Sequence, residues 1–173
     1  DEGTVVVTAC TGSVGIAAIQ LAKRKGLNVI GITRSKTKES RIAALGAKVV
    51  VEPDPAKLAE KVLALTENRG VDYVFDAVSG ETATQLLTLM NENSTFVIYG
   101  LLSDSRFTTP PNVMFNQVQV HGYVVLKNLL DTRELQRVWT DILPLIETRE
   151  VIIPVHKTFP FEHVAAAHRE MEE

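Results

Sequence analysis

The chain has 173 residues, of which 45% are hydrophobic and 23% charged, proportions that are ordinary for a globular protein of one domain. Its net charge of −3 argues against a nucleic-acid partner, and the single cysteine, Cys10, excludes an internal disulfide framework and a multi-cysteine zinc cluster. No apolar run approaches the ~20 residues that span a bilayer, so we expect a cytoplasmic or organellar-matrix protein with no membrane partner.

Short β-branched runs alternate with helical patterns along the first hundred residues. The predicted strands are Val5–Val7, Asn28–Thr33, Val49–Val51, Val71–Asp76 and Thr95–Tyr99. The predicted helices are one with apolar residues at Val14, Ala18, Leu21 and Ala22, then Ser40–Leu45, a helix that starts at Asp54–Pro55, and Glu81–Met90.

The alternation becomes less regular after Gly100. A short helix is expected at Val113–Asn116 and a sixth strand at Val118–Leu126. A long helix, Asp131–Ile146, should place Trp139 in the core, and Pro144 should kink or end it. The last stretch combines a strand-like run, Val151–Val155, with a helix-like pattern, Phe161–Glu173.

Strands and helices that alternate at this spacing predict βαβ units and a parallel sheet with helices on both faces. The fold class is therefore α/β, a doubly wound Rossmann fold with six parallel strands in the order 3-2-1-4-5-6. In that order a ligand binds at the carboxyl ends of strands one and four.

A glycine-containing turn, "ACTGSVG", lies at this predicted crevice between the first strand and the first helix. Gly12 would let the backbone approach a pyrophosphate, and Gly15 would let the helix pack closely on the strand. Ala9 stands where such turns usually carry a first glycine, which is tolerable if its φ stays negative. The alternative is an ordinary strand–helix turn, because any such turn favours glycine.

The end of the second strand, "ITRSKTK", indicates which dinucleotide would bind. A site for NAD needs an acidic residue there to bind the ribose 2′-hydroxyl, and this segment has none. Arg34, Ser35, Lys36 and Lys38 offer positive charge and a hydroxyl, which suits a 2′-phosphate. The segment therefore favours NADP(H) over NAD(H), the alternative being a solvated basic loop.

Several segments resemble the cofactor domain of the zinc-independent medium-chain dehydrogenase/reductases, which include quinone oxidoreductases of the zeta-crystallin type and enoyl thioester reductases. The matching segments are "DEGTVVVTACTGSVGIAAIQLAK", "SKTKESRIAALGAKVV", "RGVDYVFDAVSGETATQLL", "FVIYG" and "FPFEHVAAAHREME". They follow the family order along nearly the whole chain. The family turn often reads A-x-x-G-x-x-G, which Ala9 matches.

The resemblance implies roles for particular residues. The pyrophosphate turn would be Thr11, Gly12, Ser13, Val14 and Gly15, and the 2′-phosphate contacts would be Thr33, Arg34, Ser35 and Lys38. The nicotinamide ribose would lie by Val78, Tyr99, Gly100 and Leu101, and Ser79 stands where the family usually has glycine. No residue of this chain is implied as catalytic or as a metal ligand.

The resemblance also implies how the chain is organised. Residues 1–150 would be the NADP-binding domain, and residues 151–173 a segment that in the family returns to an N-terminal catalytic domain, which this chain lacks. We therefore expect a piece of a longer oxidoreductase that reduces a quinone or an enoyl thioester and that is inactive alone. The alternatives are a non-catalytic NADPH-binding or assembly module and an enoyl-reductase part of a multidomain synthase.

A homodimer is also expected. In the order 3-2-1-4-5-6 the sixth strand forms an exposed sheet edge, and its long apolar run could pair with a second copy. We therefore predict dimerisation through Val118–Leu126.

Overall fold

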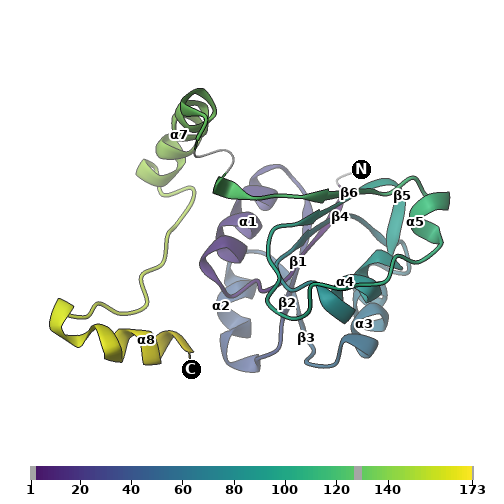
Figure 1. The fold of residues 1–173 in the computed structure, drawn as a ribbon, viewed down its shortest axis with the longest axis horizontal. Helices are drawn as coiled ribbons and strands as arrows, with labels where there is room; N and C mark the ends of the chain where they lie inside the picture. Colours follow the sequence, from purple (N-terminus) through teal and green to yellow (C-terminus); the bar gives the residue numbers. More distant parts are fainter. Residues whose placement is uncertain (1–2, 127–129, 173) are drawn as a thin grey trace.

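The computed structural model describes residues 3–126 and 130–172. Its six strands form one all-parallel sheet in the order β3-β2-β1-β4-β5-β6, which confirms the predicted fold class (Figure 1). The strands are β1 Thr4–Val7, β2 Asn28–Thr33, β3 Lys48–Val51, β4 Val71–Asp76, β5 Met90–Ile98 and β6 Gln119–Gly122.

Helices α1 and α2 lie on one face of this sheet, and α3 and α4 lie on the other (Figure 1). The bounds are α1 Ser13–Arg24, η1 Lys36–Lys38, α2 Glu39–Ala44, η2 Pro55–Lys57, α3 Leu58–Leu65, α4 Gly80–Leu87, α5 Asn112–Phe115, α7 Thr132–Glu147, η3 Phe161–His163 and α8 Val164–Glu172. Among the described residues, no helix is long and apolar enough to cross a bilayer.

The strand period of two divides the core between the two faces. Val6 of β1 packs with Leu58 of α3 and Phe96 of β5 in one buried cluster. Its neighbours Val5 and Val7 point the other way and pack in a second buried cluster with α1 and α2. Helices cover both faces over β1 and β2, where the strands carry near-continuous apolar runs, whereas the α1 face is partly open at β4, where Tyr73 is 44% exposed.

The strand register brings the carboxyl ends of three strands together at one edge of the sheet. β1 pairs with β2 on one side and with β4 on the other, so the carboxyl ends of all three strands lie side by side. The chain then turns away in opposite directions, through α1 after β1 and through α4 after β4. This topological switch opens a crevice in the position that doubly wound folds use for ligands.

Several predicted boundaries were wrong. Met90 begins β5 rather than ending the preceding helix, because its side chain is buried beside β4, where it pairs with Val71. The sixth strand is only Gln119–Gly122, and Val125 and Leu126 are helical. The apolar run beyond Gly122 therefore does not extend the sheet edge.

The C-terminal part departs furthest from expectation. Helix α7 lies apart from the sheet (Figure 1), and Trp139, predicted in the core, is 48% exposed. Pro144 does not end the helix, which runs on to Glu147. Residues 151–155 form no strand. The apolar periodicity of this part therefore predicted a helix correctly but predicted its burial wrongly.

Candidate functional site

The turn after β1 begins with a strained alanine. The amide of Gly12 donates a hydrogen bond to the Ala9 carbonyl oxygen at 3.0 Å, which closes the turn. Ala9 has φ of +45°, in the left-handed region, so the condition under which an alanine is tolerable there, a negative φ, is not met. A Cβ in that region costs about 1 kcal/mol, and the alanine therefore carries the strain that a first glycine would avoid.

Gly15 and Gly12 serve different purposes. A Cβ at Gly15 would lie 2.7 Å from both the Ala9 carbonyl oxygen and the Cys10 Cα, so only glycine lets α1 approach the turn this closely. A Cβ at Gly12 would meet only the Ala9 oxygen, at an ordinary 3.4 Å, and its φ of −79° suits any residue. Packing does not require glycine at position 12, whereas close approach of a ligand would.

The amino terminus of α1 faces this turn. Gly12 is the N-cap residue and provides no side-chain cap to the first-turn amides. Such amides have no partner within the helix and carry the positive end of its dipole. The turn thus has the backbone arrangement that accepts a phosphate group.

Cys10 lies behind the turn and is completely buried. Burial raises the pKa of its thiol to about 11, so the thiolate is disfavoured at neutral pH. Cys10 therefore acts as a small packing residue rather than as a reactive thiol.

A buried polar brace joins the ends of β1 and β4. The Thr8 hydroxyl donates to Asp76 Oδ1 at 2.6 Å and accepts from the Ala77 amide at 2.9 Å. The Asp76 carboxylate also accepts from the amides of Val78, at 3.0 Å, and Ser79, at 2.8 Å. These bonds fix the loop after β4 against the turn after β1, so the two walls of the crevice form a rigid unit.

Ser79 is the most strained residue of this loop. Its φ of +61° and ψ of −156° lie in a region that essentially only glycine occupies. Its side chain is buried, and its hydroxyl has no hydrogen-bond partner among the described residues. The serine that replaces the expected glycine therefore carries both a backbone and a desolvation cost.

The crevice contains a hollow of about 370 Å³, here called the strand-end pocket because the carboxyl ends of β1 to β4 surround it. Five predicted site residues line it: Thr11, Thr33, Arg34, Ser35 and Val78. The structure adds Ala9, which the sequence analysis placed in the turn without assigning it a cofactor contact. It also adds lining residues that the sequence analysis missed: Ile32, Glu52, Pro53, Pro55, Leu58, Thr82, Leu102 and Ser103. Most of these follow β3 or β5, so the strand pattern placed them correctly at the same sheet edge without singling them out.

Glu52 is the acidic group of this pocket. Lys61 Nζ lies 2.7 Å from its Oε2, and the amide of Asp54 donates to its Oε1 at 2.9 Å. The hydrogen bond from Lys61 is the main cause that holds the pKa of Glu52 below its ordinary value of 4.5. Its charge is thus compensated from within the chain. By contrast, the structure pairs Arg34 with no carboxylate in the residues it describes.

A second hollow of about 530 Å³ lies on the other side of the turn, between α1, the start of α2 and the segment 152–171. We call it the C-terminal recess. Gly12, Ser13 and Lys38 line it, and Thr11 lines both hollows. The structure therefore brings ten of the predicted site residues to the turn or to one of the two hollows beside it, Val14 and Gly15 included.

The other three predicted residues, Tyr99, Gly100 and Leu101, lie away from the turn and line neither hollow. Val14 is part of the turn but also lines neither hollow. Val14 is 51% exposed on the first turn of α1, and Leu101 is 58% exposed after β5. Tyr99 stacks on Phe75 with ring centroids 4.2 Å apart, and burial is the main cause that raises its pKa to about 12. Gly100 lies against the loop after β4, where a Cβ would come within 2.9 Å of the Ala77 oxygen.

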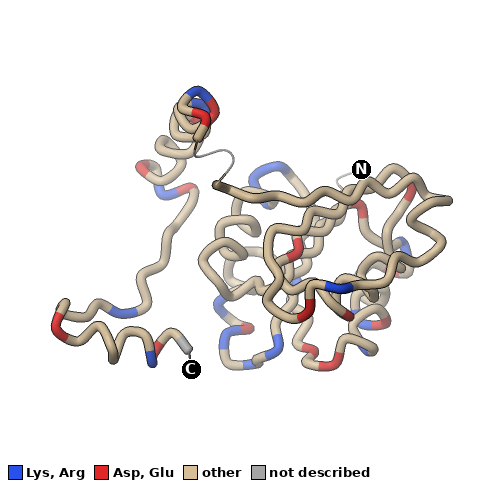
Figure 2. The backbone as a smooth tube through the Cα atoms, in the orientation of Figure 1, with Lys and Arg blue, Asp and Glu red and all other residues tan. Residues whose placement is uncertain are grey.

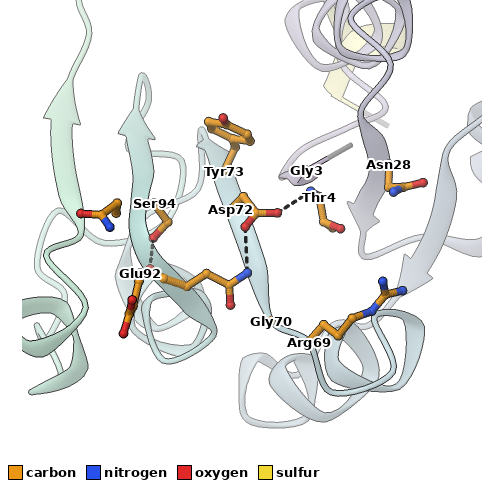
Figure 3. A pocket seen from close by; sticks show the side chains of 11 residues that line it. Gly3, Thr4, Asn28, Arg69, Gly70, Asp72, Tyr73, Glu92 and Ser94 are labelled. Carbon is orange, nitrogen blue, oxygen red and sulfur yellow. Dashed lines mark hydrogen bonds between the residues drawn. The ribbon is translucent and has the colours of Figure 1, made fainter. Parts of the chain in front are cut away.

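The opposite edge of the sheet carries a larger hollow, of about 940 Å³, at the amino ends of the strands. Figure 3 shows that its polar groups bind one another. Asp72 Oδ2 accepts from the Thr4 amide at 2.7 Å, and Asp72 Oδ1 accepts from Asn91 Nδ2 at 2.8 Å. These bonds fix the starts of β1, β4 and β5, which is a structural role.

In the described parts of the chain, no group of three or more His, Cys, Asp or Glu side chains is placed to hold a metal ion. The candidate site is therefore the crevice at the carboxyl edge, with a phosphate-accepting turn between two hollows.

Comparison with known proteins agrees with this geometry. Prostaglandin reductase 1 of Bos taurus is 29% identical over 171 residues, which cover 95% of this chain and 51% of that protein. The mitochondrial enoyl-[acyl-carrier-protein] reductase of Dictyostelium discoideum is 27% identical, with 93% and 49% covered. The chain thus spans about half the length of the curated relatives it matches.

Solved structures share the fold. The structure of mycobacterial Rv1454c complexed with NADPH superposes with a TM-score of 0.83 at 23% identity, covering 98% of this chain and 54% of that one. Residues 13–147, most of the chain, match the family described as zinc-binding dehydrogenase. The chain therefore belongs to that family, the medium-chain dehydrogenase/reductase group that its sequence resembles.

Proposed function

We propose that this chain is the NADPH-binding half of a reductase that transfers hydride to an activated carbon–carbon double bond or to a quinone. The curated relatives described above are named as a prostaglandin reductase and an enoyl reductase, and one fold neighbour was solved with NADPH. An enoyl thioester is the substrate class that we favour, and a quinone is the alternative.

One observation carries the cofactor assignment. At the end of β2, where an NAD site needs a carboxylate, the chain places Arg34 and Ser35 in the strand-end pocket and Lys38 in the adjoining recess. The acidic residue of the pocket, Glu52, is already paired with Lys61. This arrangement suits a ribose that carries a 2′-phosphate.

In this proposal, the residues of this chain bind the dinucleotide and orient it. The amides at the start of α1 would hold the pyrophosphate at Gly12, and the strand-end pocket would hold the adenosine half. The Thr8–Asp76 brace would keep the β4 loop, with Val78, at a fixed distance from the turn. NADPH supplies the hydride when it is bound.

The proposal also includes a catalytic domain that this chain does not contain. The chain covers about half of its curated relatives, and we propose that a further catalytic domain supplies the substrate pocket. Four residues that follow α7, Ile152, Ile153, Val155 and Phe161, are between 55% and 89% exposed, as a surface awaiting such a partner would be. The chain alone should bind NADPH and turn over poorly.

Binding can be tested by NADPH fluorescence with a matched pair of glycine variants. Gly12→Ala adds a Cβ that the fold tolerates but that would occupy the space of the pyrophosphate, so we expect NADPH affinity to fall about tenfold or more. Gly122→Ala adds a Cβ on β6 with nothing within 4 Å, and affinity should not change. No binding to the unmodified chain at millimolar NADPH would refute the proposal.

We further propose that two copies pair through the outer edge of β6. The described strand pairs only with β5, and its four residues are exposed. The interface would be Gln119–Gly122, shorter than the Val118–Leu126 run that the sequence indicated. Light scattering tests it: a dimer that Val120→Lys converts to a monomer is expected, and a monomeric unmodified chain would contradict it.

A further inference from the structure

The two faces of the sheet are unequally covered. Val6, Val74 and Phe96 point to the face that carries α3 and α4, and each is at most 1% exposed. Tyr73, the neighbour of Val74 along β4, points to the α1 face and is 44% exposed. Parallel sheets are normally buried on both faces. The open part of the α1 face is therefore a place where a further element would be expected to pack.

This open area is an apolar groove of about 310 Å³, here called the sheet-face groove. Ala18 and Ala22 of α1 form its side wall, and their short side chains leave the space beside the helix free. Its floor consists of two rows of side chains that the strand register places next to one another on β1, β4 and β5: Val5, Tyr73 and Thr95, then Val7, Phe75 and Val97.

The sheet-face groove has the dimensions of one short helix. Neighbouring strands lie about 4.8 Å apart, so β1 and β5, on either side of β4, are about 10 Å apart, which is the diameter of a helix. Tyr99, which stacks on Phe75, closes the carboxyl end of the floor. From Thr95 to Tyr99 the strand direction covers about 13 Å, the length of about nine helical residues.

Helix α7 has an exposed apolar face, but the chain that follows it is fixed elsewhere. The Gln20 side chain accepts from the Ile152 amide at 2.8 Å and donates to the Ile152 carbonyl oxygen at 3.0 Å. Arg24, one turn further along α1, forms an ion pair with Glu150. Residues in a helix are about 100° apart, so these two side chains lie on the flank of α1 opposite to the two alanines of the groove. The contacts therefore draw the end of α7 away from the sheet-face groove.

The rim of the groove indicates the chemistry of its occupant. On the β6 side, Gln119 and His121 continue the two rows of the floor, and His121 Nε2 lies 3.3 Å from Gln119 Oε1. On the α1 side, Lys25 lies on the same flank as Ala22 and forms no ion pair with any residue in the described ranges. Figure 2 shows the basic residues at this end of α1. An occupant with an apolar face, polar flanks and an acidic residue near Lys25 would match this rim.

We propose that the sheet-face groove binds an amphipathic helix of the catalytic half of the reductase. The inference rests on the proposed function and adds the surface through which the two halves join. The chain spans about half the length of its curated relatives, so the remaining half can supply such a helix. Its apolar face would cover the two rows of the floor. Because Tyr99, a predicted cofactor contact, closes one end of the groove, the bound helix would position the catalytic half beside the nicotinamide.

The test uses overlapping peptides of about 18 residues, long enough to form a helix, that cover all of the Bos taurus prostaglandin reductase 1 sequence. The fluorescently labelled, unmodified chain is applied to the immobilised peptides. The strongest binding is expected for an amphipathic peptide from the half of that protein that this chain does not match. Strongest binding to a peptide from the matched half, such as the counterpart of α7, would overturn the inference, and so would no binding. Peptide affinity that falls as the chain concentration rises would assign the groove to a second copy and would also overturn it.

Variants of the chain locate the binding, with fluorescence anisotropy of the selected peptide as the readout. Thr95→Lys places a charge in the floor, and Ala18→Trp fills the groove from α1, so each should weaken peptide binding about tenfold or more. Lys25→Met should weaken it about threefold, as expected for loss of an exposed ion pair. The matched control, Met114→Lys, changes a 70% exposed residue of α5 outside the groove and should alter the affinity less than about twofold. Equal losses in the groove variants and the control, or no loss in either groove variant, would overturn the inference.

NADPH titration separates this inference from the proposed function. All four variants should keep the NADPH affinity of the unmodified chain, because none of the substituted residues lines the strand-end pocket or the C-terminal recess. If the unmodified chain binds NADPH but no peptide, only the inference fails. If it does not bind NADPH, the proposed function fails, and the identification of the partner as a catalytic half fails with it.

Discussion

Apolar residues are buried in the sheet body, which runs from β1 to β6, and exposed in the C-terminal part, which runs from α7 to α8. In the sheet body, Phe96, Leu86 and Val74 are at most 1% exposed, and both faces of the sheet contact helices. In α7, Val138, Trp139 and Leu143 are between 46% and 48% exposed. Both parts show regular apolar periodicity, so periodicity alone does not indicate burial.

The difference separates the elements that form the candidate site from the elements whose apolar residues are exposed. The sheet body buries its own core and holds the turn, the brace and the strand-end pocket. The C-terminal part contributes one wall of the recess, anchored at Gln20, and otherwise presents apolar surface. A cofactor domain that functions beside a second domain would be divided in this way, in line with the proposed function.

The largest expected effect is the difference in unfolding free energy lost when a large side chain is removed from the sheet body and from α7. Phe96→Ala empties a fully buried position and should lower the free energy of unfolding by about 4 kcal/mol. Trp139→Ala, in α7, should lower it by about 0.5 kcal/mol, because the indole is half exposed. Urea denaturation followed by circular dichroism measures both. Equal losses would show that α7 is packed as tightly as the sheet.

The second largest loss of stability is expected at the buried Thr8–Asp76 brace. Thr8→Val keeps the side-chain shape but removes a donor to the Asp76 carboxylate and an acceptor for the Ala77 amide. The expected loss is about 2 kcal/mol, with weaker NADPH binding because the β4 loop is less fixed. Thr140→Val, which removes an exposed bond to the Gln136 carbonyl, is the matched control in α7 and should have almost no effect. A comparable effect of both substitutions on stability would argue against the brace.

Ser79 should show that the sheet body carries strain at the crevice. Ser79→Gly relieves the positive φ and removes the unpaired hydroxyl, so we expect a gain in stability of about 1 kcal/mol after the entropic cost of glycine. Ser79→Ala removes only the hydroxyl and should gain less. Thermal unfolding of the two variants separates the contributions, and a loss of stability in Ser79→Gly would mean that the serine is unstrained.

The smallest expected effect is on how the stability of the fold depends on pH. The pKa of Glu52 is lowered in the folded chain, mainly by Lys61, so its charged form stabilises the fold above pH 4.5 and this stabilisation is lost as the pH falls through the lowered value. Lys61→Met should flatten that part of the stability profile between pH 6 and about pH 3. Chemical denaturation across this range checks it. An unchanged profile would show that the ion pair does not contribute.

Much of the sheet body could be predicted from the sequence because local pattern and burial coincide there. Asn28–Thr33 and Val71–Asp76 were predicted to the residue, and the glycine turn was placed at the correct strand end. The sign of φ at Ala9 was not predictable, because no local pattern shows how tightly the chain turns between β1 and α1, where the Gly12 amide bonds back to the Ala9 carbonyl. The sequence analysis did not predict Glu52 as a pocket residue, because the end of β3 carries no glycine or cation that would indicate a binding site.

The C-terminal part was less predictable for a physical reason. An amphipathic helix such as α7 has the same sequence pattern whether its apolar face meets its own sheet or another domain. The position of Ile152 likewise depends on Gln20, 132 positions earlier in the sequence, whose side chain bonds both the amide and the carbonyl of Ile152, and no local pattern links the two residues.

Calorimetric titration of the unmodified chain with NADPH and with NADH tests the central claim most directly. The acid-free end of β2, with Arg34 and Ser35 at the strand-end pocket and Lys38 at the recess, predicts that NADPH binds at least about tenfold more tightly than NADH. Equal affinities, or a preference for NADH, would contradict the account.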